Sequence, residues 1–169
     1  MQISCDISCE INGKSYTRQI EPDLVLIEFL RDLGFLSLKQ GCDTTNCGLC
    51  TVWVDGTPRL SCAILAASMN GRQITTIEGV EKEARAFGQF MADQGADQCG
   101  FCSPGFIMTV LAMERELTDP SDDQIKHYLS GNLCRCTGYA SQMRAIKLYL
   151  AAKNLHGKKL HGKKGASCE

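Results

Sequence analysis

Cysteine is the residue type whose number and spacing point to chemistry in this 169-residue chain, which contains 11 cysteines. Eight of them fall into two groups of four with short internal spacings. The first group is Cys42, Cys47, Cys50 and Cys62, and the second group is Cys99, Cys102, Cys134 and Cys136. A C-x4-C-x2-C run with a distant fourth cysteine is a known spacing for the thiolate ligands of a [2Fe–2S] cluster. The first group therefore predicts an iron–sulfur site.

A zinc ion held by four thiolates is the alternative for the first group. Zinc sites usually combine two C-x2-C pairs, and the longer step from Cys42 to Cys47 fits that pattern poorly. Gly41 and Gly48 lie next to these cysteines, and glycine lets a backbone approach a cluster closely. The spacing thus favours iron–sulfur over zinc.

The second cysteine group is less specific, and taken alone it could also hold zinc. Its surroundings favour a cluster. Cys102 directly precedes Ser103 and Pro104, which predict a helix start, and Cys136 lies shortly before the last expected helix. The positive end of a helix dipole stabilises thiolates and anionic groups.

Residues 1–80 predict a small α+β domain that positions the first cysteine group. Apolar and polar residues alternate at the start of the chain, and Asn12-Gly13 predicts a hairpin turn. A helix is expected to start at Pro22-Asp23, with Asp23 as its N-cap, and to end at Gly34. The expected strands cover residues 3–11, 15–20, 51–54, 62–64 and 73–77.

Residues 81–154 predict a helical domain around the second group. One helix is expected at about 83–94 and another from Ser103, where apolar residues cover more than one face. Ser121 and Gln124 form a capping-box pattern that opens a third helix. A fourth helix carries the apolar residues Met143, Ile146 and Leu150 on one side. Residues 155–169 contain Leu-His-Gly-Lys-Lys twice, at 155–159 and 160–164, and predict a flexible basic tail.

The formal net charge of −1 gives no reason to expect nucleic-acid binding. No apolar run is long enough to span a membrane, and the first residues lack the pattern of a signal peptide. A cysteine-rich chain of this kind fits a reducing compartment, and the expected location is the cytoplasm.

The remaining candidates have structural explanations. Cys5 and Cys9 share the apolar face of the first expected strand and are predicted core residues, whereas Cys168 is a predicted free thiol in the tail. Trp53 follows the first cysteine run and is expected to pack rather than to carry electrons. The three histidines have no ligand-like spacing: His127, His156 and His161.

Three sequence motifs resemble the small iron–sulfur subunit of the molybdenum hydroxylases, the family of xanthine oxidase, aldehyde oxidoreductases and aerobic carbon monoxide dehydrogenase. They lie at residues 41–52 (GCDTTNCGLCTV), 98–105 (QCGFCSPG) and 131–139 (GNLCRCTGY). They occur in the family's order, and the likeness extends from about residue 3 to 153.

The resemblance implies a β-grasp ferredoxin-like domain followed by a four-helix domain, each with one [2Fe–2S] cluster. It also implies a hetero-oligomer with a large molybdopterin-binding subunit and a medium FAD-binding subunit. Gln98 and Cys136 match positions that lie against the pterin in the family. Electrons would therefore pass from molybdenum to the second cluster, then to the first cluster and to FAD, while another chain binds the substrate.

Two other classes of protein remain open from the sequence. The first is a free-standing ferredoxin-like electron carrier, although such a carrier would need only about the first 80 residues. The second is an interaction module stabilised by zinc.

Overall fold

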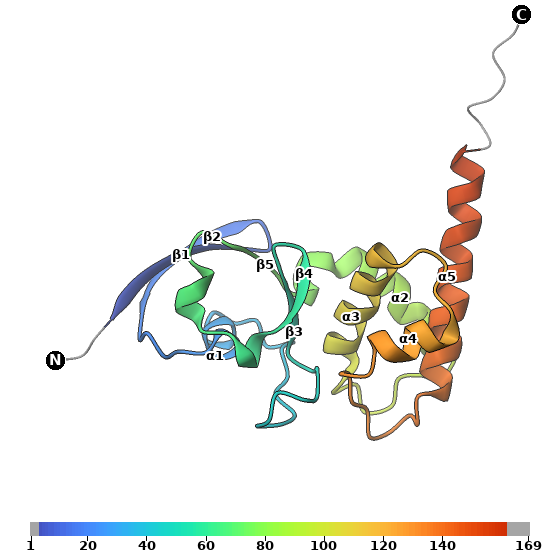
Figure 1. The fold of residues 1–169 in the computed structure, drawn as a ribbon, viewed down its shortest axis with the longest axis horizontal. Coiled ribbons are helices and arrows are strands. Elements are labelled where there is room, and N and C mark those ends of the chain that lie inside the picture. The colour runs from blue at the N-terminus through green and yellow to red at the C-terminus, as the bar shows by residue number, and fades with distance from the viewer. Residues whose placement is uncertain (1–3, 162–169) are drawn as a thin grey trace, which may run out of the picture.

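The computed structural model describes residues 4–161 of the chain, with side chains described as far as residue 154. Figure 1 shows a sheet domain and a helical domain lying side by side. Each domain has its own cluster of buried apolar residues. The α+β class and the order of the two domains agree with the sequence prediction.

The first domain is a five-stranded mixed sheet with the order β2-β1-β5-β3-β4. Strands β1 and β5 are parallel, and the other neighbours are antiparallel. The strands are β1 (Cys5–Ile11), β2 (Lys14–Ile20), β3 (Thr51–Val54), β4 (Thr57–Leu60) and β5 (Gln73–Thr75). Helix α1 (Leu26–Asp32) is the helix of this domain, and its apolar side belongs to the same core as the sheet.

The alternation in β1 places its apolar side chains on one face of the sheet. Ile7, Cys9 and Ile11 are buried, while Asp6 and Ser8 on the opposite face are exposed. These side chains pack in one core with Leu26 and other residues of α1. Burial of apolar area on this face is the main stabilising contribution of the strand.

Two local predictions in this domain were wrong. Helix α1 begins at Leu26 without a side-chain cap, because Val25 is held extended by a bridge to Leu65, so Asp23 is not an N-cap. The segment around residues 62–64 is a 3-10 turn, η1 (Ser61–Ala63), instead of a strand. The turn is fixed by Ser61, whose N–H and hydroxyl both donate to the carbonyl of Cys50.

The 3-10 turn η2 (Ala66–Met69) precedes β5 within the first domain, and the 3-10 turn η3 (Ile77–Val80) leads from β5 to the second domain. The second domain then contains α2 (Glu81–Asp93), α3 (Ser103–Glu116), α4 (Asp122–Tyr128) and α5 (Ala140–His161). Helix α3 is the buried central helix, as its apolar pattern predicted. Among the described residues, no helix combines the length and the apolar character needed to cross a membrane.

The helix ends follow the predicted signals in part. The capping box is present, because Ser121 accepts from the Gln124 N–H and the Gln124 side chain accepts from the Ser121 N–H. Helix α3 includes Ser103 and has Cys102 as its N-cap, one residue earlier than predicted. Helix α5 continues to His161, although the flexible tail was predicted from residue 155. Leucine and lysine favour helix there, and one glycine costs only about 1 kcal/mol.

The two domains are joined through buried contacts of β3. The indole N–H of Trp53 donates to the carbonyl of Met108 in α3 over 3.1 Å. The guanidinium of Arg115 lies 4.2 Å from the centre of the same ring, and Arg115 also donates to the carbonyl of Gly56. The prediction that Trp53 has a packing role is therefore confirmed.

Gln142 in α5 is a polar residue in the core of the helical domain. It is only 1% exposed, and neither atom of its carboxamide has a hydrogen-bond partner among the described residues. An unsatisfied buried polar group is destabilising by about 1–3 kcal/mol.

We therefore expect Gln142→Met, which keeps the length of the side chain, to raise the free energy of unfolding by about 1–2 kcal/mol. Urea unfolding followed by far-UV circular dichroism measures this change. The exposed Gln89 in α2 provides a control, since Gln89→Met should have little effect. A destabilised Gln142→Met variant would show that the carboxamide has a partner.

Candidate iron–sulfur sites

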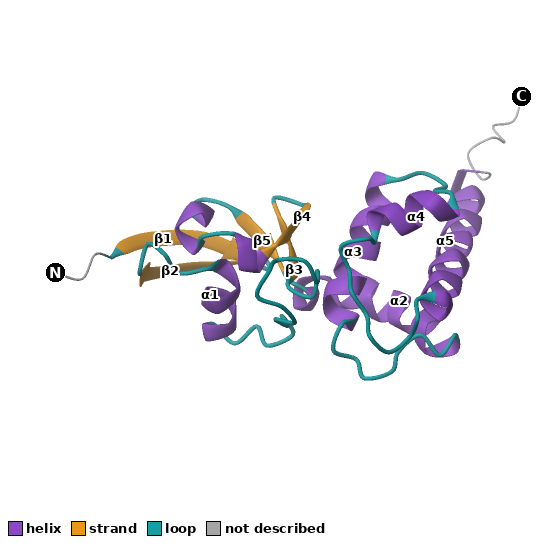
Figure 2. Cartoon of the chain, turned by 60° about the horizontal axis from the view of Figure 1, so that its bottom comes forward, coloured by secondary structure: helices purple, strands orange, loops and turns teal. Residues whose placement is uncertain are grey.

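Cys62 lies in η1, and the other seven cysteines of the two groups lie on three loops beside the domain junction. The loops are residues 33–50 after α1, residues 94–102 before α3 and residues 129–139 before α5. Figures 1 and 2 show that these loops gather at the same edge of the molecule. They line a cavity of about 400 Å³ that contains cysteines of both groups. Those cysteines are Cys42, Cys47, Cys99, Cys102, Cys134 and Cys136.

The four cysteines of the first group lie as two pairs. The sulfur atoms of Cys50 and Cys62 are 3.3 Å apart, and the thiols of Cys42 and Cys47 lie close enough to affect each other's ionisation. Two thiolates on one tetrahedral metal with bonds of about 2.3 Å would lie about 3.8 Å apart. Two such pairs therefore fit the two irons of a [2Fe–2S] cluster, with two thiolates for each iron.

The second group is paired in the same way. The sulfur atoms of Cys99 and Cys136 are 3.6 Å apart, and the thiols of Cys102 and Cys134 lie close enough to affect each other's ionisation. Two pairs of thiols again fit the two irons of a [2Fe–2S] cluster, with two thiolates for each iron.

The thiols of the first group have contrasting surroundings. Hydrogen bonds from the Cys47 thiol and from the backbone N–H groups of Cys47, Thr44 and Asn46 lower the pKa of Cys42 to about 6. Burial raises the pKa of Cys62 to about 12. The loop thus favours a thiolate at its outer ligand, whereas Cys62 would lose its proton only on binding a metal.

The second group is buried on one side and open on the other. Burial raises the pKa of Cys102, at the start of α3, to about 12. Cys99 and Cys136 are exposed. Gln98 is also exposed and donates weakly to the carbonyl of Gly95, over 3.4 Å. The two residues matched to pterin-facing positions, Gln98 and Cys136, are therefore both on the accessible side.

Thr137 and Tyr139 hold Cys134, and sequence reasoning gave neither of them a role. The Thr137 hydroxyl donates to the Cys134 sulfur over 3.2 Å. The Tyr139 hydroxyl accepts from the Cys134 N–H over 2.8 Å, and the Tyr139 N–H donates to the Thr137 oxygen. Burial opposes the ionisation of Cys134, but hydrogen bonds from Thr137 and the Cys136 N–H lower the pKa of its thiol.

A direct hydrogen bond connects the two cysteine loops. The backbone N–H of Leu133, next to Cys134, donates to the carbonyl of Cys47 over 2.9 Å. The loops approach closely because Gly48 has no side chain: a Cβ there would lie 2.3 Å from the Gly131 carbonyl oxygen. Gly48 also has a φ of 70°, which favours glycine.

The outer side of the cavity is apolar. Phe101, Leu133 and Tyr139 are large hydrophobic residues that are 43–49% exposed, and all three line the cavity next to the exposed thiols. We call these three residues the apolar rim. An exposed apolar surface of this kind is typical of a protein interface.

The other cysteines take the predicted structural positions where they are described. Cys9 is 4% exposed in the core, and Cys5 packs against the same core. The ten described cysteines are all free, and Cys168 lies outside the described residues. His127 is exposed in α4, and the side chains of the other two histidines lie outside the described part.

The fold and the paired thiols define a two-domain [2Fe–2S] protein. Residues 9–76 match the family model for a 2Fe-2S iron-sulfur cluster binding domain, and residues 76–147 match the model for a [2Fe-2S] binding domain.

Curated relatives extend this likeness along most of the chain. The chain is 47% identical over 140 residues to the xanthine dehydrogenase iron-sulfur-binding subunit of Escherichia coli O157:H7, covering 79% of this chain and 86% of that protein. It is 39% identical over 144 residues to the nicotinate dehydrogenase small FeS subunit of Eubacterium barkeri, covering 83% and 92%.

The fold is also similar to a solved structure, that of quinoline 2-oxidoreductase from Pseudomonas putida 86. The TM-score is 0.83 at 37% sequence identity, and the match covers 93% of this chain and 99% of that chain. The chain belongs to the small [2Fe–2S] subunits of the molybdenum hydroxylase family.

We expect Cys47→Ser to remove iron from the first site, because metal binding and folding of the loop are coupled. The unaltered chain should contain about four irons and four labile sulfides, and show two distinct electron paramagnetic resonance signals when reduced. The variant should keep about half the iron and only one signal. Cys5→Ala serves as the control and should keep the full iron content. Stoichiometric zinc in the native protein would contradict this assignment.

We expect Thr137→Val to lower the midpoint potential of the second site. In the unaltered chain, the hydrogen bond from Thr137 to the Cys134 sulfur stabilises the reduced cluster, which carries one more negative charge. Loss of this bond therefore makes reduction less favourable. A redox titration followed by electron paramagnetic resonance separates the two sites, and the first site should be unchanged. Thr118→Val, at an exposed position away from the cysteines, is the matched control. An unchanged potential in Thr137→Val would show that this bond does not tune the site.

Proposed function

We propose that this chain is the electron-transfer subunit of a molybdopterin-dependent hydroxylase or dehydrogenase that contains several subunits. The observation that carries the proposal is the contact between two paired thiol sites, in which the Leu133 N–H binds the Cys47 carbonyl. When bound, [2Fe–2S] clusters supply one-electron carriers. The loops would keep both carriers close together and at a fixed separation.

We assign the first cluster to the first cysteine group and the second cluster to the second group. In each site, the observed sulfur pairs suggest which two thiolates share an iron. The assigned ligands are Cys42 with Cys47, Cys50 with Cys62, Cys99 with Cys136, and Cys102 with Cys134.

The second site would face the large molybdopterin-binding subunit. Cys136 and Gln98 are exposed there, and the apolar rim beside them would be covered by that partner. The exposed turn at residues 43–46 belongs to the other cysteine loop and would lie toward a medium subunit with FAD. Electrons would then enter at the second site and leave at the first, while the large subunit binds the substrate.

A hetero-oligomer explains this chain better than a free-standing carrier. The relatives from Escherichia coli O157:H7 and Eubacterium barkeri are both named as subunits of dehydrogenases. The helical domain also adds an exposed apolar surface that a freely diffusing carrier would not need. Because the described cysteines are all free, we place the complex in the reducing cytoplasm.

Purification of the native protein tests this assignment. We expect the chain to copurify with a molybdopterin subunit and with a flavoprotein. A fully iron-loaded monomer in the native extract, with no partner, would instead support the free-carrier alternative.

In an assembled complex that carries Cys136→Ala, we expect substrate to stop reducing the first site. The reason is that the second site, where electrons would enter, has lost one of its iron ligands. Dithionite should still reduce the first site from solvent. Conversely, Cys47→Ser should leave substrate reduction of the second site intact. Rapid-freeze electron paramagnetic resonance measures both. Normal reduction of the first site by substrate in the Cys136→Ala complex would show that the proposed order is wrong.

A further inference from the structure

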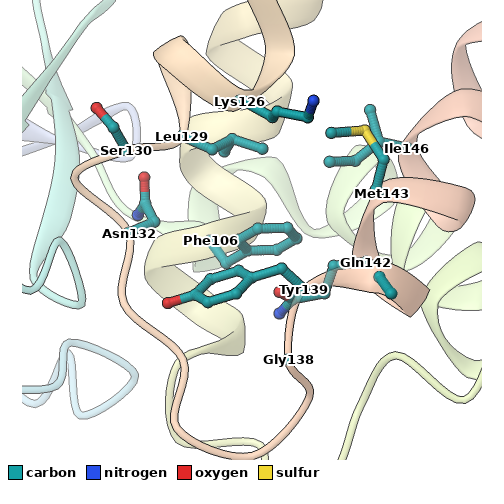
Figure 3. A pocket seen from close by; sticks show the side chains of 11 residues that line it. Phe106, Lys126, Leu129, Ser130, Asn132, Gly138, Tyr139, Gln142, Met143 and Ile146 are labelled. Atoms are coloured by element: carbon teal, nitrogen blue, oxygen red, sulfur yellow. The ribbon is translucent and has the colours of Figure 1, made fainter. Parts of the chain in front are cut away.

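The helical domain contains a second cavity. None of the six cysteines that line the first cavity lies in its walls. It has a volume of about 500 Å³ and lies among α3, α4 and α5 (Figure 3). Its walls are mainly apolar, and the volume falls in the usual range for small-molecule sites. The main apolar side chains are Phe106, Leu129, Tyr139, Met143 and Ile146.

Gln142 is the polar group that the apolar walls leave without a partner. Figure 3 shows its side chain extending from α5 toward Tyr139, beside the ring of Phe106. Both carboxamide atoms are buried and have no hydrogen bond among the described residues. A rotation of this flexible side chain toward the cavity would present one donor and one acceptor side by side.

The charge of the cavity limits the kind of ligand that it would accept. Lys126 is the charged residue in its lining, and its ammonium group is already paired with Asp123 at 3.0 Å. An anionic or cationic ligand would therefore find no free countercharge on these walls. The cavity suits a neutral molecule.

We propose that this cavity binds a neutral, flat aromatic heterocycle with a lactam edge. The N–H and C=O of a lactam lie side by side and can form two antiparallel hydrogen bonds with the Gln142 carboxamide. The rings of Phe106 and Tyr139 would contact the aromatic part. Such a ligand would satisfy the buried amide and fill the apolar space at the same time.

Tyr139 connects this cavity to the second cysteine site. Its ring lines both cavities, and its hydroxyl accepts the N–H of Cys134. A ligand that contacts the ring would disturb this hydrogen bond. Binding would therefore change the electron paramagnetic resonance signal of the second site and leave that of the first site unchanged.

Calorimetry with quinazolin-4(3H)-one tests the site in the iron-loaded chain and in the assembled complex. The matched probe is 3-methylquinazolin-4(3H)-one, in which a methyl group replaces the lactam hydrogen. We expect the first probe to bind at least about tenfold more tightly than the second, and Gln142→Met to remove this difference. Gln89→Met is the control variant and should leave both affinities unchanged. Calorimetry detects binding whether or not the chain transfers electrons.

Three outcomes would overturn the proposal. The first is equal affinity for the two probes, and the second is unchanged affinity in Gln142→Met. The third is binding to the isolated chain but not to the assembled complex, which would show that a partner subunit covers the cavity. A signal change at the second site that is absent in Gln142→Met would support the proposal independently of affinity.

Discussion

The close approach of two backbones at the domain junction determines how the cysteines are arranged. A Cβ on Gly105 in α3 would lie 2.4 Å from the carbonyl oxygen of Gly48, so only glycine fits there without displacement. The buried side chain of Asn132 donates to the carbonyls of both Gly48 and Gly105, over 3.2 and 3.4 Å. This contact holds the first cysteine loop, the central helix and the last cysteine loop as one unit, because the Asn132 side chain of the last loop binds backbone carbonyls of the other two.

The contact also explains why two small domains share one chain in a fixed relation. Each domain has its own core, and cores of this kind are often joined by a mobile linker. Here Trp53 and Arg115 add buried and stacked contacts on the other side of the junction. A fixed junction matters for electron transfer, since the relative position of two cysteine sites would otherwise vary with domain motion.

Sequence spacing identified the two cysteine groups, whereas the positions of several other residues depend on tertiary contacts. The hairpin, the central helix and the capping box follow from local patterns that the folded chain keeps. Asp23 failed as a cap because Val25 pairs with Leu65, a contact far along the chain that no local pattern records. Likewise, Cys62 reaches Cys50 because Ser61 binds the Cys50 carbonyl, which turns an expected strand into a 3-10 turn.

The roles of Thr137 and Tyr139 show where a spacing argument stops. Cysteine spacing reports which side chains can reach a metal, but it does not report which neighbours donate to sulfur or accept from the ligand backbone. Tyr139 has a φ of 67°, unusual for a residue with a side chain, and three hydrogen bonds in this turn connect it, Thr137 and Cys134. The same turn leaves Cys136 exposed and fixes Cys134 against the buried junction. A single short segment thereby separates the accessible side of the second site from the side that contacts the first loop.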